Sequence, residues 1–389
     1  MEVYIHIPFC VRKCAYCDFL SFAADDELKS RYMDALVTEI RDFPHDPPVS
    51  AESVYIGGGT PSILPAEQIA GIMDAVREVF ILDADAEISM EANPGTVTEE
   101  KLRVYRDSGI NRLSFGCQSA DDEELKALGR IHTWEQFTES FALARKAGFT
   151  NLNIDLMSGL PGQTEASWEK SLRSAAALSP EHISAYSLIL EKGTPMYDRY
   201  DAQAALLEKG ISEAELRKKI SADRYLPDEE TERRMYDRTA EILSEYGFRQ
   251  YEISNYAKEG YACRHNIGYW TGVPYVGVGL GASSYMKTTR YRNTSDMALY
   301  LRDSSLGRKW ESLNEKDLMA EFVILGLRMT EGFSRGEFLH RFGRDIDRVY
   351  GSVIDRYVKL GLLEEKNGRI RLTRQGISVS NTVMEDFLP

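Results

Sequence analysis

Three cysteines in one short loop constrain this chain more than any other feature. Cys10, Cys14 and Cys17 have the spacing C-x3-C-x2-C and follow an apolar run, residues 3–7, that predicts a strand. Three thiolates at this spacing can hold three irons of a [4Fe–4S] cube and leave the fourth iron open. The alternatives are a structural zinc site or three buried thiols. Zinc sites usually pair C-x2-C with a second pair of ligands, and the nearby sequence offers none, so the cluster is favoured.

The overall composition narrows the classes of partner. The chain has 389 residues and a net charge of −14, and an acidic surface repels phosphate backbones, so we expect no nucleic-acid partner. No apolar stretch is long enough to span a bilayer and the start lacks a signal-type segment, so any membrane contact would be peripheral. The two remaining cysteines, Cys117 and Cys263, are far apart in the sequence and suggest no disulfide framework. We therefore expect a cytoplasmic protein in a reducing compartment.

Alternating strand and helix patterns predict the fold class. The predicted strands cover residues 3–7, 53–56, 87–91, 112–115, 151–156 and 182–190. Repeated β-α units with short loops predict parallel strands and right-handed crossovers. Six units are too few for a closed eight-stranded barrel, so we expect an α/β protein with an open, partial (β/α)6 TIM-like barrel. Glycines and polar residues fall at the C-terminal ends of the strands, where barrels build their active sites.

The cysteine spacing is the signature of the radical S-adenosylmethionine (SAM) enzymes, and the chain resembles this family. The resemblance implies a [4Fe–4S] cluster whose open iron binds the amino and carboxylate groups of SAM. It also implies an electron donor, since one electron from the cluster cleaves SAM to methionine and a 5′-deoxyadenosyl radical. The sequence leaves open whether SAM is cleaved here, and it assigns no catalytic residue.

Several residues at the predicted rim match SAM-contact positions of this family. The glycine-rich run at 57–61 lets the backbone approach a ligand closely and present N–H donors. Tyr4 belongs to a run before the first cysteine that the family also carries, and a Tyr there can pack over the cluster or equally fill the core. Without the resemblance, Glu91 and Asp155 also suit a helix cap or a salt bridge, and Arg130 also suits a solvated position. The resemblance assigns to SAM binding Tyr4, Gly58, Gly59, Thr60, Glu91, Gln118, Arg130 and Asp155.

A second motif lies at residues 263–270, which contain a thiol, an imidazole and two aromatic rings. His and Cys are common haem ligands, and Tyr and Trp offer flat apolar faces with one polar edge. By composition alone, aromatic side chains that fill a core are the stronger interpretation. The order H-N-x-x-Y-W, however, resembles the motif of the haem-chaperone (HemW-like) branch of the oxygen-independent coproporphyrinogen-III-oxidase family. That resemblance implies haem binding by His265, Asn266, Tyr269 and Trp270.

The resemblance covers nearly the whole chain and leaves three functions to weigh. The favoured one is a haem chaperone that binds haem and passes it to an acceptor protein. The second is oxidative decarboxylation of coproporphyrinogen III to protoporphyrinogen IX, and the third is a radical SAM reaction on another substrate. The oxidases carry a fourth cysteine where this chain has Phe19, and an N-terminal arm for which Tyr4 leaves no room. One departure from the relatives is Ser283, where they commonly have His.

The pattern predicts four parts of the chain. These are a radical SAM core at 1–200, a helical connection at 201–245, an extension with the second motif at 246–312, and a helical, winged-helix-like domain at 313–389. A helix is expected over 228–246, a strand over 250–256 and a hairpin over 361–372. Helical patterns at 202–208 and 212–220 have no functional interpretation. The acidic charge argues against DNA binding by the hairpin.

Overall fold

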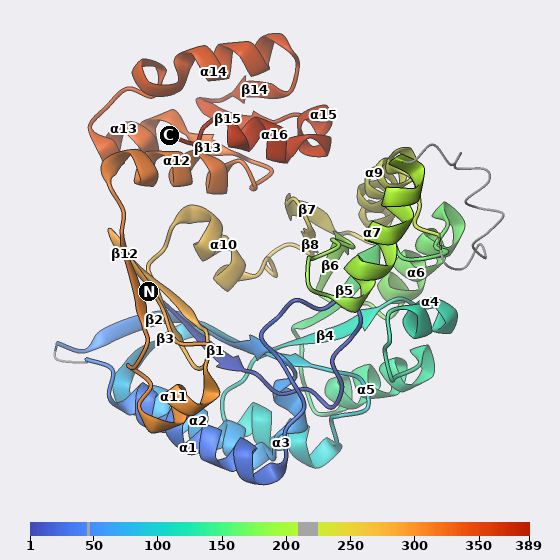
Figure 1. The fold of residues 1–389 in the computed structure, drawn as a ribbon, viewed down its shortest axis with the longest axis vertical. Coiled ribbons are helices and arrows are strands. Elements are labelled where there is room, and N and C mark those ends of the chain that lie inside the picture. Colours follow the sequence, from blue (N-terminus) through green and yellow to red (C-terminus); the bar gives the residue numbers. More distant parts are fainter. Residues whose placement is uncertain (45–46, 209–224) are drawn as a thin grey trace.

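The computed structural model describes residues 1–44, 47–208 and 225–389 and is built around one large sheet (Figure 1). Six neighbouring strands of this sheet are parallel. They are β1 (Glu2–Ile7), β2 (Val49–Gly58), β3 (Phe80–Ala92), β4 (Arg112–Gln118), β5 (Leu152–Ser158) and β6 (His182–Ser187). The predicted open, partial barrel is therefore confirmed. The third strand is longer than expected and the sixth is shorter.

Helices follow the parallel strands and cover the outer face of the sheet (Figure 1). They are α1 (Asp26–Arg41), the 3-10 turn η1 (Pro61–Ile63), α2 (Ala66–Val79), α3 (Glu99–Asp107), α4 (Asp122–Ala127), α5 (Trp134–Lys146) and α6 (Glu165–Ala177). Side chains next to their first turns fix where they begin. Asp25 accepts the N–H of Leu28 at 2.8 Å, and Thr133 and Gln136 form a reciprocal capping box.

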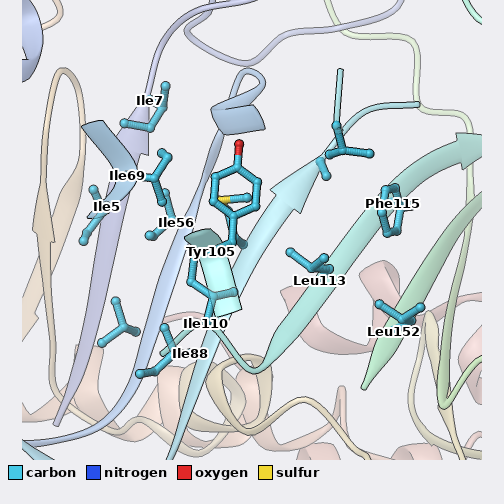
Figure 2. Close-up of a cluster of buried hydrophobic side chains, with 14 of the residues drawn as sticks. Ile5, Ile7, Ile56, Ile69, Ile88, Tyr105, Ile110, Leu113, Phe115 and Leu152 are labelled. Carbon is cyan, nitrogen blue, oxygen red and sulfur yellow. The ribbon is translucent and has the colours of Figure 1, made fainter. Parts of the chain in front are cut away.

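Alternation along the strands separates the core from the barrel interior. Ile5 of β1 pairs with Ile56 of β2, and both are fully buried beneath the helices (Figure 2). Tyr4 and Tyr55 are also register partners, and they point to the opposite face because successive side chains alternate along a strand. The aliphatic face stabilises the barrel, and the other face supplies polar groups to its interior.

Two helices lead out of the parallel part. They are α7 (Pro195–Glu208) and α9 (Glu229–Glu245). The first contains the predicted helical pattern at 202–208, whereas the pattern at 212–220 lies outside the described residues. The second is the helix expected at 228–246: Asp228 caps it by accepting the N–H of Thr231 at 2.8 Å, and Gly247 follows it with φ +84°.

Six further strands extend the same sheet on both sides of β1–β6. On one side lie β8 (Asn255–Ala257) and then β7 (Arg249–Glu252); on the other lie β9 (Tyr275–Val278), β10 (Ser283–Met286), β11 (Thr289–Arg292) and β12 (Lys309–Ser312). One of them, β9, is also parallel to its neighbour β1. The helices α10 (Arg264–Thr271) and α11 (Met297–Arg302) connect them. The expected single strand over 250–256 is wrong, because the chain turns there. The carboxylate of Glu252 accepts the N–H of Ser254 at 2.8 Å and so stabilises the turn.

The C-terminal unit has a core of its own and lies across α10 from the sheet (Figure 1). It contains α12 (Glu315–Gly326), β13 (Phe333–Ser334), α13 (Arg335–Phe342), α14 (Asp347–Lys359), β14 (Leu363–Lys366), β15 (Arg369–Leu372), α15 (Arg374–Ser378) and α16 (Ser380–Glu385). The expected hairpin is β14–β15, and β13 completes a three-stranded sheet. Within the described ranges, the helices include none with the length and apolar character needed to cross a membrane.

Candidate functional site

The C-terminal ends of the parallel strands surround a cavity of about 370 Å³. The cysteine loop after β1 and the glycine turn after β2 both contribute to its wall. All but one of the residues that the resemblance assigned to the cluster and SAM line it. These are Cys10, Cys14, Cys17, Gly58, Gly59, Thr60, Glu91, Gln118, Arg130 and Asp155. Segments far apart in the sequence therefore meet at one rim, as the strand order requires.

The three thiols are free and half-buried around this cavity. In the described part of the chain, no three His, Cys, Asp or Glu side chains approach closely enough to share one metal ion. The three thiols line one common cavity. Thr60 donates its hydroxyl to Sγ of Cys10 at 3.5 Å, and Arg130 donates to Sγ of Cys14 at 3.7 Å. Donors already in place next to thiolates stabilise their negative charge.

The glycine turn after β2 has no space for side chains. A Cβ atom at Gly58 would lie 2.5 Å from the ring of His6, and one at Gly59 would lie 2.6 Å from the carbonyl oxygen of Phe9. Gly58 also has φ +114°, which other residues rarely adopt. The turn therefore brings its backbone directly against the cluster loop, where Thr60 donates its N–H to the Phe9 carbonyl at 2.8 Å.

Two half-buried carboxylates line the cavity from β3 and β5. Glu91 accepts the N–H of Gly58 at 2.9 Å and the hydroxyl of Tyr55 at 3.1 Å. Burial, and then the charge of Asp155, raise the pKa of Glu91 to about 7. Burial also raises the pKa of Asp155, which accepts hydrogen bonds from Asn153 at 2.7 Å and Ser114 at 3.1 Å. A cationic ligand would stabilise both carboxylates in their charged form.

Arg130 and Gln118 complete the rim. Arg130 donates to the side-chain oxygen of Asn93 at 2.9 Å and to the carbonyl of Gly116 at 2.6 Å. Gln118 is buried, has φ +70° and lies at a register shift between β4 and β5. A non-glycine residue held in this region is strained, and such strain is concentrated at functional sites. Its side-chain oxygen accepts the hydroxyl of Tyr186 at 2.9 Å.

Tyr4 is the expected SAM contact that does not line the cavity. Its hydroxyl lies 2.9 Å from Nδ1 of His6, and its ring stacks on Tyr55 with the centroids 6.4 Å apart. Tyr55 does line the cavity, so Tyr4 lies behind it. Sequence analysis did not identify Tyr55, Asn93 or Tyr186 as site residues. The only signal for Tyr55 is its position on the inward face of β2, opposite Tyr4.

The second motif forms the helix α10, and its residues divide between different surroundings. Asn266 lines the cluster cavity. His265 is only 1% exposed, with Nδ1 lying 2.8 Å from the hydroxyl of Ser53 and Nε2 lying 3.1 Å from that of Tyr269. Burial lowers the pKa of His265 to about 3, so its ring is neutral at pH 7. Both ring nitrogens therefore have partners within the protein.

Tyr269 and Trp270 line another cavity, of about 430 Å³, between α10 and the C-terminal unit. Tyr275 and Tyr285 from the extension and Phe322 from α12 contribute to the same walls. Cavities of this size suit small organic ligands. The H-N-x-x-Y-W helix thus supplies residues to both cavities, with His265 between them: its ring stacks on Tyr55 at 5.1 Å and meets Tyr269 edge-on at 4.8 Å.

Comparison with known proteins identifies two family domains and relatives of the same length. The sequence matches the radical SAM superfamily over residues 4–175 and the HemN C-terminal domain over residues 313–379. It is 36% identical to the heme chaperone HemW of Bacillus subtilis (strain 168), over 100% of this chain and 99% of the relative. It is 34% identical to the heme chaperone HemW of Lactococcus lactis subsp. lactis (strain IL1403), over 100% of this chain and 97% of the relative.

A solved structure has the same fold throughout. The coproporphyrinogen III oxidase (HemN) from Escherichia coli, described as a radical SAM enzyme, superposes with a TM-score of 0.79 and 24% identity. The match covers 99% of this chain and 89% of the other. It extends over both the barrel and the C-terminal unit, and at this identity it shows a shared fold.

Proposed function

Because the chain belongs to the family of the heme chaperone HemW proteins and carries a radical SAM domain, we propose that it is a haem chaperone. It binds haem and delivers it to an acceptor protein. The observation that carries this proposal is the identity of 36% and 34% along the full length of two HemW proteins. The likeness to the oxidase HemN is one of fold, and Phe19, which is 65% exposed at the cavity, replaces the fourth cysteine expected of an oxidase.

The cofactors of the radical SAM domain are a [4Fe–4S] cluster and SAM. We assign the cluster to Cys10, Cys14 and Cys17, whose thiols line one cavity beside donors from Thr60 and Arg130. When bound, the cluster supplies one-electron chemistry next to SAM. The electron has to come from a donor, and both that donor and the haem acceptor are partners of the proposal. The five cysteines are free, which suits a reducing, cytoplasmic compartment.

We assign SAM to the same cavity, against Glu91, Asp155 and the turn of Gly58 and Gly59. SAM carries an ammonium and a sulfonium charge, which the carboxylates of Glu91 and Asp155 can attract in addition to the charge of Arg112. Burial raises the pKa of both acids, so a cationic ligand regains the free energy that their ionisation costs. Gln118 and Arg130 offer further polar contacts in the same cavity, and Tyr4 stacks on Tyr55.

We assign haem to the region of α10. Tyr269 and Trp270 present aromatic surface to a cavity, whereas His265 is buried behind Tyr269 with both ring nitrogens hydrogen-bonded. We therefore propose that His265 positions Tyr269. Asn266 faces the cluster cavity, on the side of SAM.

A haem titration of the reconstituted protein tests the function. We expect saturable binding near one haem per chain, followed by visible absorbance. In His265→Ala we expect weaker binding with the Soret band at an unchanged wavelength, because a positioning residue changes affinity and not ligation. A shifted Soret band would instead make His265 an iron ligand, and absence of binding by the wild-type protein would reject the chaperone.

A second experiment tests the cluster assignment. Cys14→Ser should abolish the broad iron–sulfur absorbance after reconstitution, because a hydroxyl is a poor iron ligand. The control is Cys263→Ser, since that buried thiol lies outside the loop and donates to Glu87 at 3.2 Å, which a hydroxyl can also do. An unchanged spectrum and iron content in Cys14→Ser would reject the assignment.

A further inference from the structure

The cavity between α10 and the C-terminal unit is mainly apolar and aromatic. Tyr269 and Trp270 come from α10, and Phe322 and Leu325 come from α12, which packs against α10. The rings of Tyr269 and Tyr275 meet edge-to-face with centroids 4.6 Å apart. Aromatic side chains in a cavity wall offer flat apolar area to a planar ring system. Three carboxylates, of Glu321, Glu331 and Glu337, also line the cavity.

One cation at this cavity lacks an acidic partner. Arg290 pairs with Glu321 at 2.7 Å, and Arg369 lies 3.6 Å from Glu337. Arg341, within the ranges that the structure describes, has no carboxylate at ion-pair distance; it donates to the hydroxyl of Tyr285 at 3.2 Å. An unpaired guanidinium at the edge of an apolar cavity is a binding site for a carboxylate.

The position of Arg341 links the two sides of the cavity. A Cβ atom at Gly272, which ends α10, would lie 3.1 Å from its Nη1. The guanidinium of α13 therefore lies over the end of α10, next to Trp270. The indole nitrogen of Trp270 is itself buried and has no hydrogen-bond partner in the described part of the chain. The charged group and the aromatic walls thus belong to one space.

We propose that this cavity binds a planar tetrapyrrole with carboxylate side chains. The macrocycle lies against Tyr269, Trp270 and Phe322, and one carboxylate binds Arg341. The inference rests on the proposed function, which supplies haem as the ligand, and it adds the place and the contacts. It also separates the haem site from the SAM site, which lies in the cavity of the cysteine loop.

The test measures porphyrin affinity in the full-length, reconstituted protein. Haemin and iron-free protoporphyrin IX are titrated against wild type, Arg341→Glu and Leu325→Trp. Reversing the charge at Arg341 should weaken both dicarboxylates by about tenfold or more, because it replaces a charge-assisted hydrogen bond with repulsion. Filling the cavity at Leu325 should weaken them by displacing the ring. The dimethyl ester of protoporphyrin IX should bind wild type and Arg341→Glu alike, because it has no carboxylate.

Arg302→Glu is the matched control. Arg302 is exposed at the end of α11, away from the cavity, and the same charge reversal there should leave porphyrin affinity unchanged. Equal affinity of wild type and Arg341→Glu for haemin would overturn the inference and leave the proposed function standing. Failure of the wild-type protein to bind haemin would overturn the proposed function itself.

Discussion

Glu91 is a half-buried carboxylate at the wall of the cluster cavity. It lies at the end of β3, bound to Tyr55 and to the backbone of Gly58, with Asp155 nearby. Its charged form is stabilised by hydrogen bonds and by Arg112, but burial outweighs them and raises its pKa to about 7. Such a group binds a cation best above that pH, where it is ionised.

This pKa predicts a pH-dependent stability in the absence of SAM. Since the pKa of Glu91 is higher in the folded protein, the folded state binds more protons between pH 4.5 and about 7, and stability falls as the pH rises through that window. Across this window the free energy of unfolding should fall by an amount on the order of 3 kcal/mol. Glu91→Gln resembles the protonated acid at every pH. Thermal unfolding should therefore show similar stability of both proteins at pH 5 and a more stable variant at pH 8.

An exposed carboxylate on α5 provides the control. Glu139→Gln should retain the pH dependence of the wild-type protein, because Glu139 is exposed to water. If Glu91→Gln and wild type lose stability equally between pH 5 and pH 8, Glu91 does not carry the effect.

At the scale of single residues, the sequence predicts the residues at the rim of the cluster cavity better than those in the interior of the barrel. Glu91 and Asp155 are predictable because they end parallel strands, and such ends share one edge of a sheet. Tyr55 and Tyr186 are not, because nothing in the sequence indicates which inward-facing tyrosine reaches a cavity. The hydrogen bond between the His265 ring and Ser53 likewise joins residues far apart in the chain, and it can be recognised only in the folded sheet.

The helix α10 is the element on which both cavities depend. Its start is fixed from the barrel side, where Glu87 accepts the N–H of Arg264 at 3.0 Å. Its end is fixed by Gly272, which has φ +71° and lies against Arg341. Sequence analysis placed the whole motif at haem, because a motif gives no direction to its side chains. In the helix, Asn266 and Trp270 face different cavities.

Two glycines that follow helices allow the effect of backbone strain to be measured separately from the effect of a contact at the cavity. Gly272 after α10 and Gly343 after α13 are both left-handed, at φ +71° and +61°. Either one changed to Ala should lower stability by about 1 kcal/mol, measured by thermal unfolding. Only Gly272→Ala displaces Arg341, since a Cβ at Gly343 meets no atom within 4 Å. Haem affinity should therefore fall in Gly272→Ala alone; equal affinity in both variants would contradict this.

Elements of strong periodicity were predictable, and a tight turn was not. The hydrophobic spacing of α1 and the acidic start of α9 were sufficient to predict both helices. Residues 250–256 instead form the hairpin β7–β8. The turn depends on Glu252, whose carboxylate accepts from Ser254 and from the side chain of Asn255, and nothing in the local pattern distinguishes it from a strand.

At the scale of the whole molecule, the C-terminal unit joins the barrel through a small set of contacts. Ile253 donates its N–H to Arg328 at 3.1 Å, and Thr330 donates to Tyr251 at 3.0 Å. Arg328 also lies 3.6 Å from the buried carboxylate of Glu252 and 4.2 Å from the ring centre of Trp270. The cavity between the two parts exists only through this docking. No sequence pattern could indicate it, because it depends on how two separate cores meet.

The ion pair at this junction gives a prediction for the whole fold. Burial raises the pKa of Glu252, and Arg328 compensates its charge. Arg328→Ala should therefore lower the free energy of unfolding by about 2 kcal/mol. This value is smaller than that of a fully buried ion pair, because Arg328 is partly exposed. The variant should also be cut more readily at the junction in limited proteolysis. Adding Glu252→Gln removes the unpaired charge and should restore part of the stability. No recovery in the double variant would show that the pair does not hold the junction.

The shared helix has a thermodynamic consequence. Because α10 forms a wall of both cavities, a shift of this helix alters the two binding equilibria together, and they are linked. Linkage is reciprocal: the factor by which SAM changes the affinity for tetrapyrrole equals the factor by which tetrapyrrole changes the affinity for SAM. In such a carrier, SAM binding can change the affinity for tetrapyrrole through α10, with no contact between the two ligands.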